Sequence, residues 1–117
     1  MATKQGTVAR PTKSTEWVIK YATSQARNGW TDMCATQKNA LTDAWDYLTK
    51  KPLADEPPHG RLKGDLATVT RNGVSHERRQ YELKNGARIW YWVEGQTVML
   101  ERVETHHPNA TKKRGKG

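Results

Sequence analysis

Hydrophobic residues follow two different periods along the chain, and the change falls near Pro52. Residues 17–21 are mostly β-branched or aromatic, which predicts a short strand. From about residue 24 to residue 50, apolar residues recur every three or four positions, which is typical of an amphipathic helix or a helical hairpin. This stripe consists of Ala26, Trp30, Met33, Cys34, Gln37, Ala40, Leu41, Ala44, Trp45 and Leu48. Pro52 is predicted to stop the helix.

Beyond the proline-rich connection at residues 56–60, the pattern indicates strands. The strongest turn signal is Asn72-Gly73, and further turns are expected at residues 84–86 and 94–96. They bound predicted strands at residues 78–83, 87–93 and 97–105. The chain is therefore predicted to be α+β: an N-terminal strand, a helix or helical hairpin, then an antiparallel β-meander with helices packed on one face.

The strand predicted at residues 87–93 has two distinct faces, because alternate side chains of a strand point to opposite sides. The set predicted to face the core is Ile89, Tyr91 and Val93. The set on the opposite, uncovered face is Arg88, Trp90 and Trp92. Indoles on an open sheet can stack on nucleic-acid bases, and a nearby arginine can contact phosphate. In the alternative interpretation, both tryptophans pack beneath a loop or an edge strand.

Charge favours a polyanionic partner. The 117 residues carry 20 Lys+Arg and 12 Asp+Glu, a formal net charge of +8. Such a surplus attracts nucleic acid, although it also falls within the range that solubility alone explains. Residues 1–14 and 111–117 are basic and lack apolar periodicity, so they are predicted to be disordered arms flanking one domain at residues 15–110.

Membrane, secretory and metal-dependent classes receive no support from the sequence. No apolar run approaches the length of a membrane span, and the first fourteen residues contain no secretory core, so we expect a cytoplasmic protein without membrane contact. Cys34, His59 and His76 have no metal-ligand spacing, so neither a metal nor a cofactor is expected. Cys34 falls on the helical stripe and is predicted to be a small core residue.

Three short motifs occur in an order that resembles the RelE/ParE superfamily of bacterial toxins. They are Leu62-Lys63-Gly64-Asp65-Leu66, the strand at residues 88–93, and a valine-rich strand ending in His106-His107-Pro108. The resemblance extends from about Trp17 to Lys113. Residues 72–77, the strand at residues 78–83 and the tandem histidines depart from the usual family form.

The resemblance implies a RelE-like fold and one of two toxic activities. RelE-like members enter the ribosomal A site and cleave mRNA, and a cognate antitoxin protein wraps and blocks them. ParE-like members share the scaffold but inhibit DNA gyrase. The sequence favours the mRNA endonuclease, with the gyrase inhibitor and a noncatalytic nucleic-acid-binding module as alternatives.

Metal-independent RNA cleavage needs a base for the 2′-hydroxyl, a cation for the phosphorane and an acid for the leaving oxygen. Arg88 matches the family's strand arginine and is predicted to hold the scissile phosphate. His106 or His107 would be the acid or base, and the match to the family favours His106. Arg79 is a candidate second phosphate contact, with Arg78 as its substitute if the register differs by one residue.

Further candidates would bind RNA without reacting. They are Lys63, Arg78, Trp90, Trp92, Lys112 and Lys113. The plainer alternatives are that Lys63, Arg78 and Arg79 are ordinary surface charges, and that His106 and His107 form a solvated strand end. Arg88 could instead form a salt bridge with Glu82 or Glu101 across the sheet.

Overall fold

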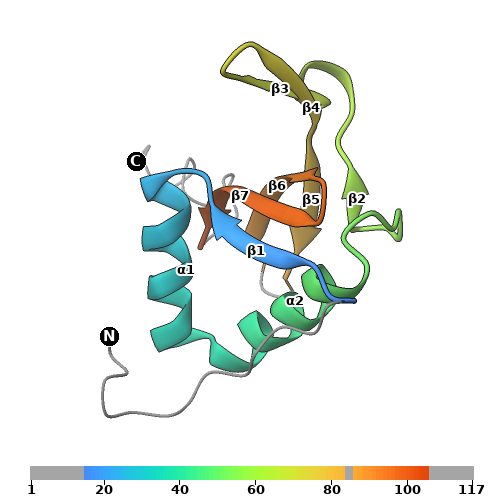
Figure 1. Cartoon of the computed structure of the whole chain (residues 1–117). Coiled ribbons are helices and arrows are strands. Elements are labelled where there is room, and N and C mark those ends of the chain that lie inside the picture. The colour runs from blue at the N-terminus through green and yellow to red at the C-terminus, as the bar shows by residue number, and fades with distance from the viewer. Residues whose placement is uncertain (1–14, 84–85, 106–117) are drawn as a thin grey trace.

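The computed structural model describes residues 15–83 and 86–105 and has an α+β fold with two helices and a mixed β-sheet (Figure 1). The elements are β1 (Val18–Tyr21), α1 (Ser24–Thr36), α2 (Lys38–Lys50), β2 (Gly60–Arg61), a 3₁₀ turn (Gly64–Leu66), β3 (Thr68–Arg71), β4 (Val74–Glu77), β5 (Arg79–Glu82), β6 (Arg88–Glu94) and β7 (Thr97–Glu104). The predicted α+β class and the order of strand, helices and strands are confirmed.

The main sheet has the strand order β1-β7-β6-β5-β2. Strands β5, β6 and β7 form the predicted antiparallel meander. Strand β1 adds in parallel to the outer side of β7, with Ile19 opposite Val98. The last strand of the described chain therefore lies inside the sheet, between the first strand and β6.

The predicted helical stripe forms two helices, α1 and α2, separated only by Gln37. Thr23 caps α1, because its side-chain oxygen accepts a hydrogen bond from the Ala26 N–H at 3.0 Å. Cys34 is exposed, so the prediction that it packs in the core is wrong. Its neighbour Met33 is fully buried instead. In the part of the chain that the structure describes, no helix is long and apolar enough to cross a membrane.

The core lies between the helices and one face of the sheet. Leu48 from α2 and Ile89, Leu100 and Val103 from the sheet are fully buried. Tyr91 is also fully buried, and its hydroxyl donates to the Pro52 carbonyl at 2.7 Å, so a hydrogen bond ties β6 to the end of α2. Burial raises the pKa of Tyr91 well above its usual value. The prediction that Tyr91 is a core residue is confirmed.

Helix α1 is held directly against the backbone of β7. The side-chain amide of Gln25 donates to the Val103 carbonyl at 2.9 Å and accepts from the Val103 N–H at 2.9 Å. One turn later, Gly29 lies so close that an added Cβ would be 2.3 Å from the Val103 carbonyl oxygen. Glycine is therefore required at position 29 by the distance between helix and strand.

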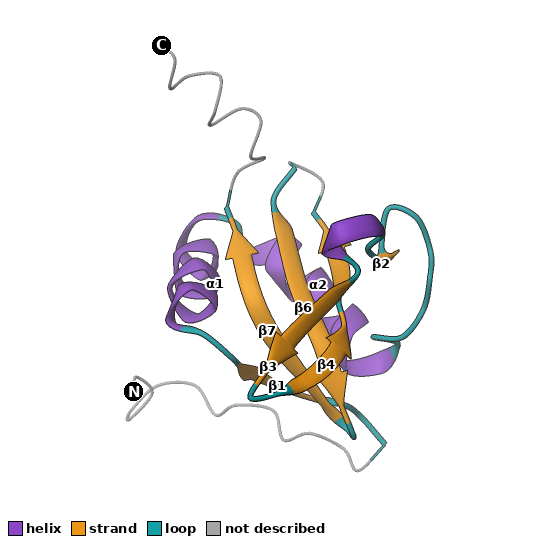
Figure 2. Ribbon diagram, turned by 90° about the horizontal axis from the view of Figure 1, so that it is seen from above, coloured by secondary structure: helices purple, strands orange, loops and turns teal. Residues whose placement is uncertain are grey.

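The β3–β4 hairpin forms a separate two-stranded sheet on the face opposite the helices. Figure 2 shows it crossing over β6 and β7, with α2 behind them. Its turn is the predicted Asn72-Gly73, where both residues have positive φ (52° and 80°). The face that the helices leave free is thus partly covered by this hairpin.

Replacing Gly29 with alanine tests the contact between α1 and β7. Alanine normally stabilises a helix relative to glycine, but here its Cβ would press on the Val103 backbone. We expect Gly29→Ala to lower the free energy of unfolding by about 1–3 kcal/mol, as overpacking does. Urea denaturation measures this, with Asn28→Ala, an exposed site on the same helix, as control. Stabilisation by Gly29→Ala would contradict the close approach.

Candidate nucleic-acid interface

The sheet face opposite the helices carries an ordered array of polar and aromatic side chains. Strand register places Arg88 between Glu82 on β5 and Glu104 on β7. The next row places Trp90 between Gln80 and Arg102. Both rows come from the alternation along β6 that the sequence predicts, and the assignment of Arg88 and Trp90 to this face is confirmed. They bring guanidinium groups and carboxylates together on one surface.

Gln80 connects the two rows. Its side-chain oxygen accepts one hydrogen bond from Nη1 of Arg88 at 3.2 Å and another from the indole N–H of Trp90 at 3.1 Å. Gln80 is only 8% exposed, so water does not easily replace it as the acceptor. Gln80 thereby fixes the position of Arg88 relative to Trp90.

Trp90 is partly buried and is not a bare stacking surface. The guanidinium of Arg78 lies 5.0 Å from the centre of its ring. Glu101 holds Arg78 there through two hydrogen bonds, of 2.9 Å from Nε and 2.8 Å from Nη2. The register of β6 and β7 shifts at this point and leaves Glu101 as an extra residue, a β-bulge. The bulge thus supplies the carboxylate that fixes Arg78 over Trp90.

Trp92 is 2% exposed, so the prediction that it offers an open stacking surface is wrong. The β3–β4 hairpin covers it: His76 stacks on its ring at 5.1 Å, and Arg71 lies 5.6 Å from the ring centre. The indole N–H donates to Glu94 at 2.7 Å, and Nε2 of His76 lies 3.4 Å from the same carboxylate oxygen. Trp92 anchors the hairpin to the sheet, as in the alternative interpretation.

Arg79 lies on the other side of the sheet from Arg88. Its register partner is the core residue Tyr91, and it is 6% exposed. Its guanidinium pairs with Glu77 at 3.0 Å and with Asp55 at 3.5 Å. The prediction of Arg79 as a phosphate contact beside Arg88 is therefore wrong. Arg78, the alternative, is the member of the pair that lies on the Trp90 side.

Two arginines on this face are already paired with acids. Arg78 binds Glu101, and Arg102 forms a close ion pair with Glu104. The Arg102 side chain is largely exposed, whereas the Arg78 side chain is largely buried. Any further anion at these two guanidinium groups would have to compete with the carboxylates that already bind them.

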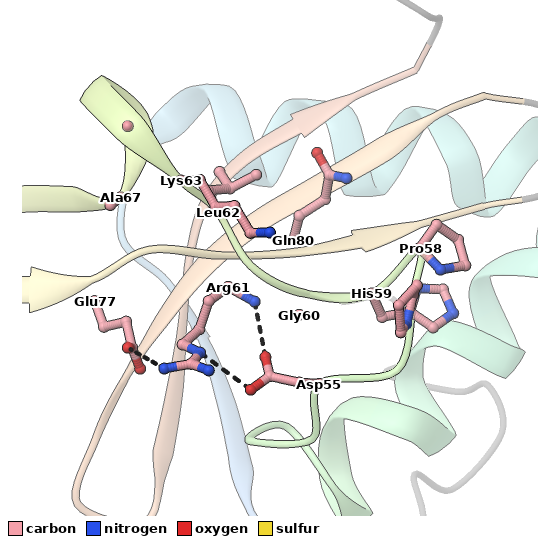
Figure 3. A pocket seen from close by; sticks show the side chains of 12 residues that line it. Asp55, Pro58, His59, Gly60, Arg61, Leu62, Lys63, Ala67, Glu77 and Gln80 are labelled. Atoms are coloured by element: carbon pink, nitrogen blue, oxygen red, sulfur yellow. Dashed lines mark hydrogen bonds and ion pairs between the residues drawn. The ribbon is translucent and has the colours of Figure 1, made fainter.

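A groove of about 700 Å³ lies at the edge of this face, where β2 and the following 3₁₀ turn run beside β5. Figure 3 shows Lys63 and Gln80 on one side of it, and Asp55, Arg61 and Glu77 on the other. Asp55 accepts from the Arg61 N–H and pairs with its guanidinium, both at 3.0 Å. The Arg61 N–H, followed by its guanidinium, holds the pKa of Asp55 below its usual value.

His59 occupies the end of the groove nearest α2. Its Nδ1 accepts a hydrogen bond from the backbone N–H of Glu82 at 3.1 Å, and its ring stacks on Tyr81 with 4.2 Å between centres. Partial burial lowers the pKa of His59, so the neutral ring is favoured. His59 therefore has a structural role: it links β5 to the connection that follows α2.

The remaining predicted residues are His106, His107, Lys112 and Lys113. They lie outside the described residues, where the chain continues beyond Thr105. Within residues 15–83 and 86–105, no three His, Cys, Asp or Glu side chains are grouped in a way that could hold a metal ion.

Sequence reasoning missed the polar neighbours of Arg88, chiefly Gln80 and Glu104. The signal was present: pairing the strand at residues 78–83 with the strand at residues 87–93 puts Gln80 on the same face as Arg88 and Trp90. Without the register of the pair, one residue of slip moves Gln80 to the core side.

No protein-family model, curated protein or solved structure matches this chain.

Gln80→Leu tests the link between Arg88 and Trp90. The substitution keeps the volume but leaves two partly buried donors without this acceptor, so we expect a loss of about 1–3 kcal/mol in the free energy of unfolding. Gln80→Glu keeps an acceptor for both donors and should cost less. Chemical denaturation of the three proteins makes the comparison. Equal stability of Gln80→Leu and wild type would contradict this role.

The lowered pKa of His59 predicts a pH-dependent stability. The unfolded chain binds the His59 proton more tightly than the folded protein, so the free energy of unfolding should fall as pH drops below about 6.5. The fall should end below the pKa of the folded state. In His59→Asn, which keeps a side-chain acceptor for the Glu82 N–H, the decrease should be smaller. Thermal unfolding from pH 7.5 to pH 5 measures both proteins, and identical pH profiles would refute the assignment.

Proposed function

We propose that this protein is a RelE-like toxin of a toxin–antitoxin pair, which binds mRNA on the ribosome and cleaves it without a metal ion. The observation that supports this most is Arg88, which lies on the helix-free sheet face between its register partners Glu82 and Glu104 and is oriented by Gln80. The motif resemblance supports the ribosomal target and a cognate antitoxin as partner. The net charge of +8 is consistent with an RNA partner.

In this proposal Arg88 stabilises the phosphorane that forms when the 2′-oxygen attacks the phosphate. A guanidinium stays protonated at neutral pH, and here its direction is set in advance by the Gln80 oxygen. Glu82 and Glu104 are the register partners of Arg88, and Glu104 is held by Arg102, so Glu82 is the carboxylate that would remove the 2′-hydroxyl proton. His106 or His107, the next residues after Thr105, would protonate the leaving 5′-oxygen.

The binding mode differs from the stacking platform that the sequence predicts. Trp92 supports the hairpin, and Arg78 lies over Trp90. Because the Arg78 side chain is itself only 13% exposed, we propose that RNA contacts this face through Arg88 rather than by stacking on an indole.

Inducible expression in bacteria tests the proposal. Wild type should stop growth and generate new mRNA 5′ ends at ribosome-occupied codons. Arg88→Ala should lower the cleavage rate by about 10²–10³, as expected for loss of a group that stabilises developing charge. The double variant His106→Ala/His107→Ala should also lose cleavage, so cells that express it should grow. Lys50→Ala, an exposed lysine on α2, is the control and should remain toxic.

Two outcomes would contradict the proposal and identify the alternatives. Intact mRNA with an SOS response and altered supercoiling would indicate a gyrase inhibitor. RNA binding that persists without new 5′ ends, in wild type and in the histidine variant alike, would indicate a noncatalytic module.

A further inference from the structure

The groove at the sheet edge adjoins the face of Arg88 through one shared residue. Gln80 lines the groove, and the same side chain binds Arg88 and Trp90 through its oxygen. The amide nitrogen on the other side of that group is a hydrogen-bond donor. Figure 3 shows Gln80 and Lys63 on the same side of the groove. The groove and the Arg88 site are therefore adjacent, with Gln80 common to both.

The charges around the groove leave one cation available. Its two carboxylates are already bound: Asp55 pairs with Arg61 and Arg79, and Glu77 pairs with the same two arginines. Lys63 is exposed, and no carboxylate in the described parts of the chain forms an ion pair with it. The side of the groove nearest Gln80 thus offers an ammonium group without an acid to neutralise it.

The volume and chemistry of the groove fit a nucleotide of a single strand. About 700 Å³ is within the range of small-ligand sites. An ammonium and an amide N–H₂ are both donors, and phosphodiester oxygens accept from such groups. The rest of the lining includes Pro57, Pro58 and Leu62, apolar groups against which a sugar or base can pack.

We propose that this groove holds the nucleotide that adjoins the one at Arg88, with Lys63 contacting its phosphate. The inference rests on the proposed RNA-binding function and adds a second subsite to it. It extends the RNA footprint across the β5 edge, toward the segment that carries β2.

Fluorescence anisotropy with a labelled, fully 2′-O-methylated RNA nonamer tests this subsite, because that RNA cannot be cleaved through its 2′-oxygen. One phosphate contact to a single strand contributes about 0.7 to the slope of log affinity against log salt, which corresponds to about fivefold in affinity at 0.1 M salt. We expect Lys63→Ala to lower the magnitude of the salt slope by about 0.7 and the affinity by about fivefold. Lys63→Arg should keep wild-type binding. Lys50→Ala removes the same charge from α2 and should have neither effect.

The outcomes separate the subsite from the proposed function. If wild type does not bind the nonamer, or Arg88→Ala binds it as tightly as wild type, the RNA-binding function itself is overturned. If Arg88→Ala weakens binding but Lys63→Ala leaves affinity and salt slope unchanged, only the groove subsite is overturned. Equal losses in Lys63→Ala and Lys50→Ala would also overturn it, because they would reflect general charge.

Discussion

The two-residue alternation along β6 is the constraint on which the rest of the structure depends. One set of side chains, including Ile89 and Tyr91, is buried beneath the helices. The other set, including Arg88 and Trp90, must then lie on the opposite face, where Gln80 joins them. Because a slip of one residue would exchange the two sets, burial of Tyr91 fixes the position of Arg88. The core and the candidate interface are two sides of one register.

Much of the fold could be predicted because its signals are local. The period of residues 87–93 and the Asn72-Gly73 turn each depend on neighbouring residues only, and both were assigned correctly. The break between the helices at Gln37 could not be placed, because no glycine or proline marks it. Cys34 was misassigned because a helical stripe determines a face only to within one neighbouring position.

The candidate site was harder to predict, because its environment is tertiary. Trp92 is buried by a hairpin that packs on the sheet, and no local sequence pattern indicates where the hairpin packs. Arg78 and Arg79 lie on opposite faces of the sheet. Only the register with β6 determines which of the two lies on the same face as Trp90. Arg78 also depends on the bulge at Glu101, which alternation alone does not predict. The sequence therefore located Arg88 but not the groups that surround it.

The position of β7 has a consequence for the order in which the protein can form during synthesis. This strand pairs with both β1 and β6, and its backbone at Val103 forms two hydrogen bonds with Gln25 of α1. A nascent chain that lacks residues 97–104 has neither a partner for β1 nor the second neighbour of β6. The two halves of the sheet therefore join only after translation has passed these residues, and a product truncated before them would lack the assembled domain.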